Sequence, residues 1–567
     1  MWCRPLPDIH TFVLANLAGL QFDHNYNERR FMQRPLRRLH MLLLIVALDI
    51  IVSSSFWSLF RRRHPSTMQF KLVASSWASF ALLAAVQAAS QTCDIVNSQR
   101  ASIQSLSKNA GGYNTEQDHY WSTACGDLKP TCILKPKNAQ EVSFIMQTLQ
   151  ANNETFAVKS GGHNPNNYFA SVQDGPLIST TALNPEVVYN AENNTVTVGP
   201  GNRWDDVMGA LDGKNVTVVG GRIGNVGVGG YLLGGGLGFL STQYGWAANQ
   251  IVEAEVVLAN GTIVTASETA NPQLLMALRG GGNNFGIVTK FVLRAYPIGQ
   301  VWGGNMVFGA SKTDEILAAV RDFTENYDNH PKAAIIATAE ITALDAVRIW
   351  TLFFFYDGET PPAGVFDKFV AAKPTINNCK SRSYADLLSY NNWAVLHGSR
   401  YVIATETSPL PSAADGARVM RSYYDYWFNT SEPRAITPGS VSSMAFQPIP
   451  KSMARIARDK GGDLIDLDDS TDRLIFEFNY SYWFSISDKA VADTTAKLVD
   501  GMKALVDGYV ADGTLPDAYR PLFMNDAYHD QDYWGRLRPE KRQLAADVRA
   551  QVDPENIFAK RTGGIKL

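Results

Sequence analysis

Hydrophobic residues recur along most of the chain with two periods, three to four residues as in helices and two residues as in strands. The first clear unit begins with an apolar strand at 131–134. After Asn138 and Glu141, which have the spacing of a capping box, it continues into a helical stripe. The stripe consists of Val142, Ile145, Met146 and Leu149. A second apolar strand follows at 156–158, so the pattern predicts a β-α-β unit that ends in a glycine turn.

A second unit has the same order of elements. A strand at 196–198 precedes another helical stripe, and a strand at 216–219 then enters a glycine-rich segment at 220–238. This stripe consists of Trp204, Val207, Met208 and Leu211. Apolar side chains lie between the glycines of 220–238, whereas flexible linkers are polar, so we expect the segment to be packed.

A β-hairpin and a third glycine turn are predicted beyond the second unit. Strands at 251–258 and 262–265 flank an Asn-Gly pair at 260–261, which is favoured in tight hairpin turns. A short helix at 274–278 leads into a glycine turn at 279–289, which enters a strand. Three glycine turns in one lobe indicate one extended cradle for a ligand.

From Val301 onward, long strands separated by helices predict an antiparallel sheet that helices cover on one face. The strands are expected at 348–356, 401–407, 441–448 and 474–484, and the helices include 413–428 and 488–510. The fold class is therefore α+β, with a second lobe built on this sheet.

The strand at 474–484 has two different faces, because successive side chains of a strand point to opposite sides. One face carries the aromatic residues Phe476, Phe478, Tyr480, Tyr482 and Phe484. The other face carries Ile475, Glu477, Asn479, Ser481 and Trp483. An aromatic stripe is more often core than binding site.

Composition excludes some classes of function. With 567 residues, of which 45% are hydrophobic, the chain can form two or more lobes with large cores. The formal charge is −3, and there is no basic run beyond Arg61–Arg63. Nucleic acid is therefore not an expected partner.

The segment before residue 89 has the character of a targeting region. Residues 41–60 are mostly apolar and about long enough to cross a bilayer. A second apolar run at 72–86 follows Met68 and ends in small residues, which predicts a secretory signal at 68–88. We therefore expect a secreted protein that begins at Met68, with 1–67 a non-native extension. A membrane anchor at 41–60 is the alternative.

Two further features agree with secretion. Asn-x-Ser/Thr sequons, which predict N-glycans, occur at Asn153, Asn193, Asn215, Asn260, Asn429 and Asn479. After residue 88 the cysteines are Cys93, Cys125, Cys132 and Cys379, an even number that suits an oxidising compartment. We expect Cys93 to pair with Cys125 or Cys132. No cluster of cysteine and histidine has the spacing of a metal site, so no metal is expected.

The first glycine turn carries the clearest candidate for chemistry. Gly161 and Gly162 lack a Cβ, so the backbone can take a positive φ and approach a bound group, and His163 leaves the turn at a fixed point. Alone, such a turn is usually a solvated surface loop. The sequence contains neither a Rossmann fingerprint nor a phosphate-binding P-loop. A ligand bound by the three glycine turns would therefore be contacted from several sides.

Several motifs together resemble one protein family. They are Lys159–His163, Val226–Gly230 with Gly234–Gly238, and Arg279–Thr289, and they are similar to the flavin-binding lobe of the vanillyl-alcohol oxidase superfamily. Within it, the berberine-bridge-enzyme-like branch is most similar. At the C-terminus, Asp553–Phe558 resembles that branch's D-P-x-x-x-F motif, and Gly563–Leu567 resembles the tail of its fungal members. The resemblance covers residues 93–567.

The resemblance implies an architecture and a cofactor. A two-lobed PCMH-type FAD-binding domain is implied at 93–298, a substrate domain at 299–520, and a segment returning to the FAD-binding domain at 521–567. His163 would bond covalently to the 8α-methyl of FAD. Many relatives add a second bond from a cysteine, but Ile223 stands at that position, so we expect a single link. The other FAD-binding residues implied are Lys159, Ser160, Gly161, Gly162, Asn164, Gly221, Asn225, Val226, Gly227, Gly230, Gly286, Ile287 and Val288.

The catalytic base departs from the family pattern. The segment 523–528 is similar to the family's Y-x-N-Y, whose final tyrosine often acts as base, but Asp526 stands at that position. A carboxylate can accept a proton when its pKa suits the step. Asp526, Tyr528 and His529 all stay open as the base.

The resemblance also implies candidates for the substrate pocket. The family lays the sheet of the second lobe over the flavin, so Tyr480 and Tyr482 are candidates for lining that pocket.

The resemblance implies an enzyme that oxidises a small molecule by hydride transfer to FAD, with dioxygen as the expected acceptor. The expected substrate is a secondary-metabolite alcohol or a scaffold that cyclises on oxidation. A carbohydrate oxidase acting at an anomeric carbon is one alternative, and a secreted flavin-binding protein without activity is another.

Overall fold

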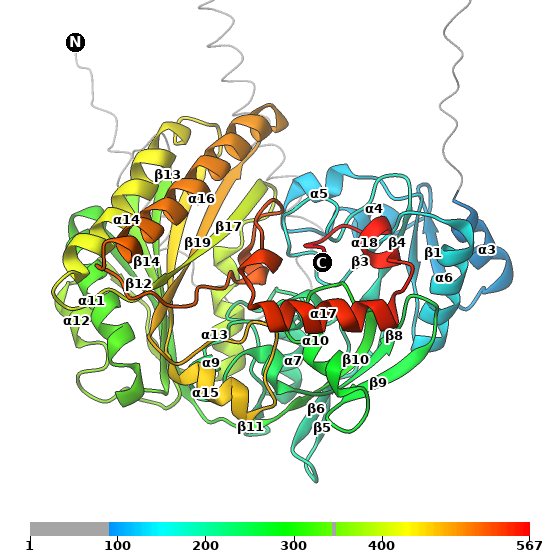
Figure 1. The fold of residues 1–567 in the computed structure, drawn as a ribbon, viewed down its shortest axis with the longest axis horizontal. Coiled ribbons are helices and arrows are strands. Elements are labelled where there is room, and N and C mark those ends of the chain that lie inside the picture. Colours follow the sequence, from blue (N-terminus) through cyan, green and yellow to red (C-terminus); the bar gives the residue numbers. More distant parts are fainter. Residues whose placement is uncertain (1–89, 343–346) are drawn as a thin grey trace, which may run out of the picture. The chain divides into compact units, whose positions relative to one another are not determined.

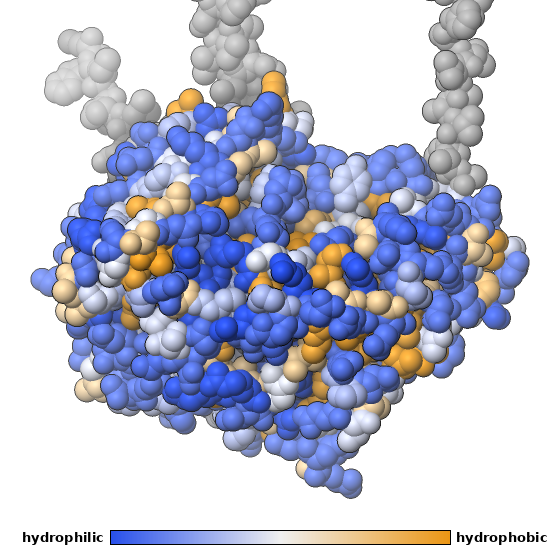
Figure 2. All heavy atoms as spheres, viewed as in Figure 1, coloured by the Kyte–Doolittle hydropathy of each residue, from blue (hydrophilic) through white to orange (hydrophobic). Residues whose placement is uncertain are grey.

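The computed structural model describes residues 90–342 and 347–567, which all belong to one structural unit (Figure 1). The expected extension 1–67, signal 68–88 and span 41–60 lie outside the described residues. Among the helices of the described ranges, none has the length and apolar character needed to cross a bilayer. The face drawn in Figure 2 is largely hydrophilic, with scattered apolar residues.

The first sheet contains the first predicted unit. Its strand order is β1 (Gln104–Ser107), β2 (Cys132–Lys135), β4 (Pro176–Ser179) and β3 (Ala157–Lys159). Helix α6 (Ala139–Asn152) joins β2 to β3, and the Asn138 side chain caps it by accepting a hydrogen bond from Glu141 N at 3.0 Å. The predicted strands and helix are confirmed, but β4 lies between β2 and β3 and runs parallel to both.

A disulfide joins Cys93 of α3 (Gln91–Gln99) to Cys132 of β2. Of the two pairings considered for Cys93, the one with Cys132 is therefore confirmed. Cys125, in α5 (Thr123–Asp127), is buried, and its Sγ lies 3.4 Å from Pro165 O. It is a free thiol, as is Cys379, so the even number of cysteines does not produce two disulfides here.

The second sheet contains the predicted hairpin. Its order is β5 (Val188–Asn190), β6 (Thr195–Val198), β10 (Ile287–Arg294), β8 (Ile251–Val257) and β9 (Ile263–Ser267). Its core also includes residues of α7 (Trp204–Leu211), α8 (Val228–Leu233) and α10 (Pro272–Leu278). The strand predicted at 216–219 is shorter, because only β7 (Val216–Thr217) finds a partner, β11 (Tyr296–Pro297). Val228 and Leu232 are fully buried, so the glycine-rich segment is packed, as predicted.

The third sheet is antiparallel and carries the second lobe. Its order is β15 (Ile376–Asn377), β12 (Val301–Gly309), β14 (Val347–Tyr356), β13 (Ala333–Thr342), β18 (Val441–Ile449), β19 (Arg473–Tyr482) and β17 (Arg400–Pro409), and β16 (Lys380–Arg382) also pairs with β12. One face packs against α11 (Thr313–Glu325), α12 (Asp367–Ala371), α14 (Gly416–Ser431) and α16 (Asp488–Ala511) (Figure 1). The predicted strands and helices of this lobe are confirmed within a few residues at their ends.

The two faces of β19 differ as the alternation predicts. Its aromatic side chains lie in the core between the sheet and the helices, where the Tyr423 ring of α14 lies 5.0 Å from that of Phe476. Glu477, Asn479 and Ser481 point to the opposite face. The helices therefore leave one polar face of the sheet for a binding site.

The C-terminal segment returns to the first lobe through α17 (Pro539–Val552) and α18 (Ile557–Arg561) (Figure 1). The D-P-x-x-x-F motif includes a helix cap, because the Asp553 carboxylate accepts hydrogen bonds from the backbone N of Ile557 at 2.7 Å and of Phe558 at 2.8 Å. Arg561 O accepts a hydrogen bond from Phe156 N at 2.9 Å, so the tail lies beside the start of β3. Shorter helices lie in the connections: α4 (Tyr113–Gln117), α9 (Ser241–Tyr244), α13 (Tyr384–Tyr390) and α15 (Ser452–Asp459).

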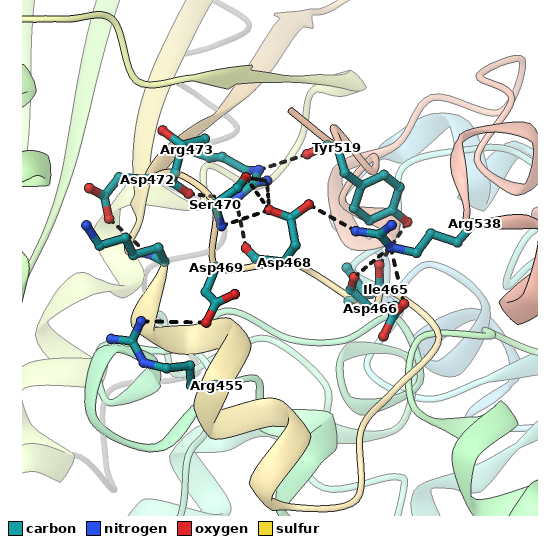
Figure 3. A network of polar contacts seen from close by, with 12 residues as sticks. Arg455, Ile465, Asp466, Asp468, Asp469, Ser470, Asp472, Arg473, Tyr519 and Arg538 are labelled. Atoms are coloured by element: carbon teal, nitrogen blue, oxygen red, sulfur yellow. Dashed lines mark hydrogen bonds and ion pairs between the residues drawn. The ribbon is translucent and has the colours of Figure 1, made fainter. Parts of the chain in front are cut away.

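An acidic loop ties the third sheet to the C-terminal segment (Figure 3). Arg473, the fully buried first residue of β19, donates hydrogen bonds to Asp468 Oδ1 and to Tyr519 O, each at 2.8 Å. Arg538, just before α17, donates to Asp468 Oδ2 at 3.0 Å. Burial would raise the pKa of Asp468, but bonds from Ser470 and Arg473 outweigh it and lower that pKa to about 2. Asp468 therefore joins two guanidinium groups from distant segments.

We expect Arg473→Met to lower the free energy of unfolding by about 3–5 kcal/mol, because it removes a buried partner of Asp468 and leaves carbonyl oxygens unsatisfied. The measurement is urea-induced unfolding followed by tryptophan fluorescence. Arg455→Met is the matched control, because the half-exposed Arg455 lies 3.8 Å from Asp469 and should contribute less than about 1 kcal/mol. Equal losses in both variants would contradict a structural role of the buried network.

Candidate cofactor and active site

A cavity of about 480 Å³ lies between the glycine turns of the first lobe and the polar face of the third sheet. Its lining residues come from the three glycine turns, from strands β13, β17, β18 and β19, and from the C-terminal segment. The expectation that the turns form one cradle is therefore confirmed. The third sheet and the C-terminal segment form the rest of its wall.

The first two glycine turns meet backbone to backbone. A Cβ built on Gly161 would lie 2.6 Å from Gly227 N, and a Cβ built on Gly227 would lie 2.4 Å from Gly161 N. Gly162 has a φ of +67°, a conformation that favours glycine. Ser160 fixes the contact, because its Oγ donates to Pro200 O at 2.6 Å and accepts from Gly229 N at 3.2 Å. The absence of side chains here lets the backbone itself form the cavity wall.

His163 lies in the cavity wall as part of a stack of three rings. Its centroid lies 4.6 Å from that of Trp121, which stacks in turn on Tyr401 of β17 at 4.3 Å. Its Nε2 is buried and has no hydrogen-bond partner among the described residues. Burial, followed by the influence of Arg203 and His397, lowers the pKa of His163 to about 3. The imidazole is therefore neutral, and one ring nitrogen keeps a free lone pair.

The site of the second tether in relatives is apolar here. Ile223 lines the cavity and packs against a cluster that includes Trp121 and Tyr401. No cysteine is found among the described residues that line the cavity. The geometry agrees with a single covalent link, which stays a prediction.

Most residues implied to bind FAD do line the cavity. They are Ser160, Gly161, Gly162, His163, Asn164, Gly221, Val226, Gly227, Gly230, Gly286, Ile287 and Val288. The turns, the unpartnered imidazole nitrogen and the enclosed volume together fit a flavin dinucleotide.

Lys159 and Asn225 do not face the cavity, which corrects the expectation for both. Val158 lines the cavity, so the alternation of β3 turns Lys159 to the other side. The Lys159 side chain is only 2% exposed, and its Nζ lies 3.7 Å from Glu116 Oε1. The backbone of Asn225 is held by Asn392, whose Oδ1 accepts from Asn225 N at 2.8 Å. These two residues therefore support the turns from behind.

Asp526 lines the cavity together with Glu477 of β19. Asp526 Oδ2 accepts a hydrogen bond from Gln447 Nε2 at 2.9 Å, and Gln447 Oε1 accepts one from Arg222. Burial raises the pKa of both carboxyls, and the charge of Asp526 raises that of Glu477 further. Two interacting carboxyls titrate as a pair, so near neutral pH they hold one proton between them.

The hydrogen-bond network indicates which carboxyl is ionised. Gln447 donates to Asp526 and stabilises its charged form, and Arg222 adds a positive charge nearby. Glu477 faces the negative charge of Asp526. The shared proton is therefore assigned to Glu477, and Asp526 is the carboxylate.

The structure corrects three aromatic candidates. Tyr480 lies in the helix-side core, where its hydroxyl is 2.7 Å from Ser431 Oγ, and Tyr482 lies in the same core. They face the helices because α14 and α16 cover the aromatic side of β19. Tyr528 is likewise part of that core and does not line the cavity. His529 pairs with Asp530 near the surface, so Asp526 is the only one of the proposed bases that reaches the cavity.

Reasoning from the sequence missed Glu477, Glu340 and Asn525. Glu477 stood on the polar face of a predicted strand, and that contrast with the aromatic face was the available signal. Glu340 of β13 also lines the cavity, and burial raises its pKa. Asn525 ties the C-terminal segment to the second glycine turn, because it accepts from Gly236 N at 3.0 Å and donates to Tyr231 O at 3.1 Å.

Comparison with known sequences gives a consistent match. A family model described as FAD binding domain matches residues 130–267. An uncharacterized FAD-linked oxidoreductase from Arthroderma benhamiae is 43% identical over 462 residues, covering 81% of this chain and 91% of the relative. The bifunctional solanapyrone synthase of Alternaria solani is 33% identical over 477 residues, covering 81% and 85%.

Solved structures share the fold. Xylooligosaccharide oxidase from Myceliophthora thermophila has a TM-score of 0.68 at 18% identity, with 84% of this chain and 99% of that one covered. Berberine bridge enzyme from Eschscholzia californica has a TM-score of 0.66 at 17% identity, with 84% and 99% covered. These likenesses establish a PCMH-type FAD-binding architecture, whereas identities this low say nothing of the substrate.

We expect Gly227→Ala to lose bound flavin and to destabilise the protein by about 1–3 kcal/mol, because the new Cβ forces the two turns apart. The measurements are the flavin absorbance per protein and the thermal midpoint. Gly209→Ala is the control, since Gly209 lies in α7 and a Cβ added there would meet no atom within 4 Å. It should gain roughly 0.5–1 kcal/mol. A normal flavin content in Gly227→Ala would contradict the role of this contact.

Proposed function

Because this chain belongs to the FAD-linked oxidoreductases and has the fold of berberine bridge enzyme, we propose that it oxidises a C–H bond of a small organic molecule at FAD held in the cavity. The observation that carries the proposal is one cavity lined by a neutral His163 and by the Asp526–Glu477 pair. When bound, FAD supplies the acceptor for a hydride. The protein supplies position, exclusion of water and a proton acceptor.

In this proposal the three glycine turns hold FAD, and His163 forms the one covalent bond to it. A neutral imidazole nitrogen is a competent nucleophile, and the ring is oriented by its stack on Trp121. Ile223 offers no sulfur for a second bond. The tether would keep the cofactor in place through many turnovers.

Asp526 takes the role of the proton acceptor. A substrate hydroxyl or amine that lies against its free oxygen can pass its proton to Asp526 while the neighbouring C–H bond is broken. The proton on Glu477 lowers the repulsion in the pair and so keeps Asp526 ionised. Gln447 fixes the orientation of the Asp526 carboxylate.

We place a secondary-metabolite alcohol or an oxidative ring closure first among substrates, since the relative from Alternaria solani is named as a synthase. Oxidation of a sugar at its anomeric carbon is the second candidate. It is favoured by the polar residues Glu340, Ser443 and Asn479, which line the cavity from neighbouring strands and could bind hydroxyl groups. A protein that binds flavin without activity is the third candidate, and Asp526 paired with Glu477 argues against it.

We further propose dioxygen as the acceptor that reoxidises the enzyme, and a secreted glycoprotein as its form. Five sequons carry asparagines outside the cavity, namely Asn153, Asn193, Asn215, Asn260 and Asn429. Asn479 lines the cavity, so a glycan there would fill the proposed active site, and we leave this sequon out of the proposal.

The proposed function is tested by mixing the purified full chain with a panel of aromatic and aliphatic alcohols and of oligosaccharides under anaerobic conditions. We expect loss of the oxidised flavin absorbance with members of one class, and formation of hydrogen peroxide when air is admitted. Bleaching by oligosaccharides alone would favour the second candidate. A flavin that no compound reduces would leave only the binding protein.

The pH dependence of flavin reduction tests the carboxyl pair. Asp526 accepts a proton only when ionised, so the rate constant should rise with pH through the raised pKa of the pair and then level off. Asp526→Asn should lower the plateau about 10²- to 10⁴-fold. Glu477→Gln replaces a group that is already uncharged while Asp526 titrates, so it should leave the pH of the rise nearly unchanged. Stopped-flow absorbance with a reducing substrate gives these values, and photoreduction of the flavin serves as a control for its integrity. An unchanged plateau in Asp526→Asn would exclude Asp526 as the base.

A further inference from the structure

Arg203 lies behind the contact between the two glycine turns and holds both of them. It is the N-cap residue of α7, and its guanidinium donates to Gly161 O at 2.8 Å through Nη2 and to Asn225 O through Nη1. Its backbone forms an antiparallel bridge with Gly227. One side chain therefore joins the turn that carries His163 to the turn that faces it.

The Arg203 guanidinium is a partly buried cation whose direct hydrogen bonds go to backbone carbonyl oxygens. Among the described residues, no carboxylate forms a close ion pair with it, and the charges of Asp206, Asp205 and Glu116 stabilise it only from a longer distance. Burial of an unpaired charge is costly, and the carbonyl oxygens of Gly161 and Asn225 offset part of that cost. A positive charge that is kept beside a binding site in spite of this cost indicates a functional role for Arg203.

The charge of Arg203 acts on His163. After burial, Arg203 is the largest influence that lowers the pKa of His163, and His397 is the next. His119 lies beside Arg203, with its Nε2 at 3.2 Å from Nη2, and its own pKa is lowered by burial and by Arg203. Lys159 lies deeper and is neutralised by Glu116, and the rings of Trp121 and Tyr401 carry no charge. The surroundings of His163 are thus biased against imidazolium.

We propose that Arg203 is the positioning residue for attachment of the flavin: it fixes the His163 turn against the opposite turn and places a positive charge near the imidazole that forms the bond. The inference rests on the proposed covalent link. Attachment replaces one C–H bond of the 8α-methyl by a C–N bond to His163. The C–H proton and the imidazole N–H proton go to solvent, the flavin ring takes up the electron pair, and dioxygen then accepts these two electrons with two protons to give hydrogen peroxide.

The experiment follows acid-stable flavin in the full chain. Protein made under riboflavin limitation is incubated with FAD between about pH 4 and 8, samples are precipitated with acid, and the flavin in the pellet is measured. In the wild type the rate should be independent of pH over most of this range, because the pKa of His163 is about 3. Arg203→Gln should attach flavin about tenfold more slowly, and its rate should fall earlier on the acid side, by about one pH unit, since loss of the cation raises the pKa of His163.

Two further variants separate positioning from general stability. Arg203→Lys keeps the charge but can reach only one carbonyl oxygen well, so it should restore the pH profile while attaching flavin more slowly than the wild type. Arg473→Gln is the matched control, because Arg473 is also a buried arginine bound to backbone carbonyl oxygens, those of Asp468, Thr471 and Tyr519, and it does not line the cavity. It should lower the thermal midpoint and leave the pH profile of attachment unchanged.

The outcomes distinguish this inference from the proposed oxidation. A profile for Arg203→Gln that is parallel to the wild type at all pH values, or an equal change in Arg473→Gln, would overturn the role of Arg203 and leave the oxidase proposal intact. Wild-type protein without acid-stable flavin would overturn the tether and this inference together. Reduction by substrate of FAD bound without a tether in Arg203→Gln would still support the proposed oxidation.

Discussion

The site depends on a contact that excludes side chains. Gly161 and Gly227 approach so closely that a Cβ on either residue would overlap the backbone of the other. The contact brings two turns from different β-α units into one wall, and His163 leaves that wall at a position set by the backbone. Ser160 and Arg203 then satisfy the polar groups around the contact. The cavity, the orientation of the imidazole and its neutral state all follow from this arrangement.

The two faces of the third sheet have different roles: one forms a hydrophobic core and the other faces the proposed active site. The helix-side face is aromatic and forms the core of the second lobe. The other face brings Glu477 to the cavity, where the C-terminal segment adds Asp526. Neither residue would have a shifted pKa in water, because burial raises both pKa values and the charge of Asp526 raises that of Glu477 further. The carboxyl pair therefore exists only when the two lobes and the C-terminal segment are assembled.

Whatever depends on short-range patterns could be predicted well from the sequence. The strands, the long helices, the hairpin at Gly261 and the glycine turns were all predictable, because period and turn chemistry are local properties. Prediction from the sequence failed where the outcome depended on which face of a strand packs against another helix or strand. The alternation in β19 separated Tyr480 from Glu477 correctly, but only the packing of α14 and α16 decides which face is core. The same holds for Lys159, which the alternation of β3 turns away from the cavity.

The central proposal for this protein is that the cavity holds FAD by a single covalent bond to His163. The direct measurement is mass spectrometry of a tryptic digest of the full chain, in which residues 160–203 form one peptide because no lysine or arginine lies between Lys159 and Arg203. We predict that this peptide alone carries the flavin mass and fluorescence, and that fragmentation places the flavin on His163. Flavin on another residue, a second flavin-bearing peptide, or a flavin-free 160–203 peptide from fully loaded protein would contradict the single tether.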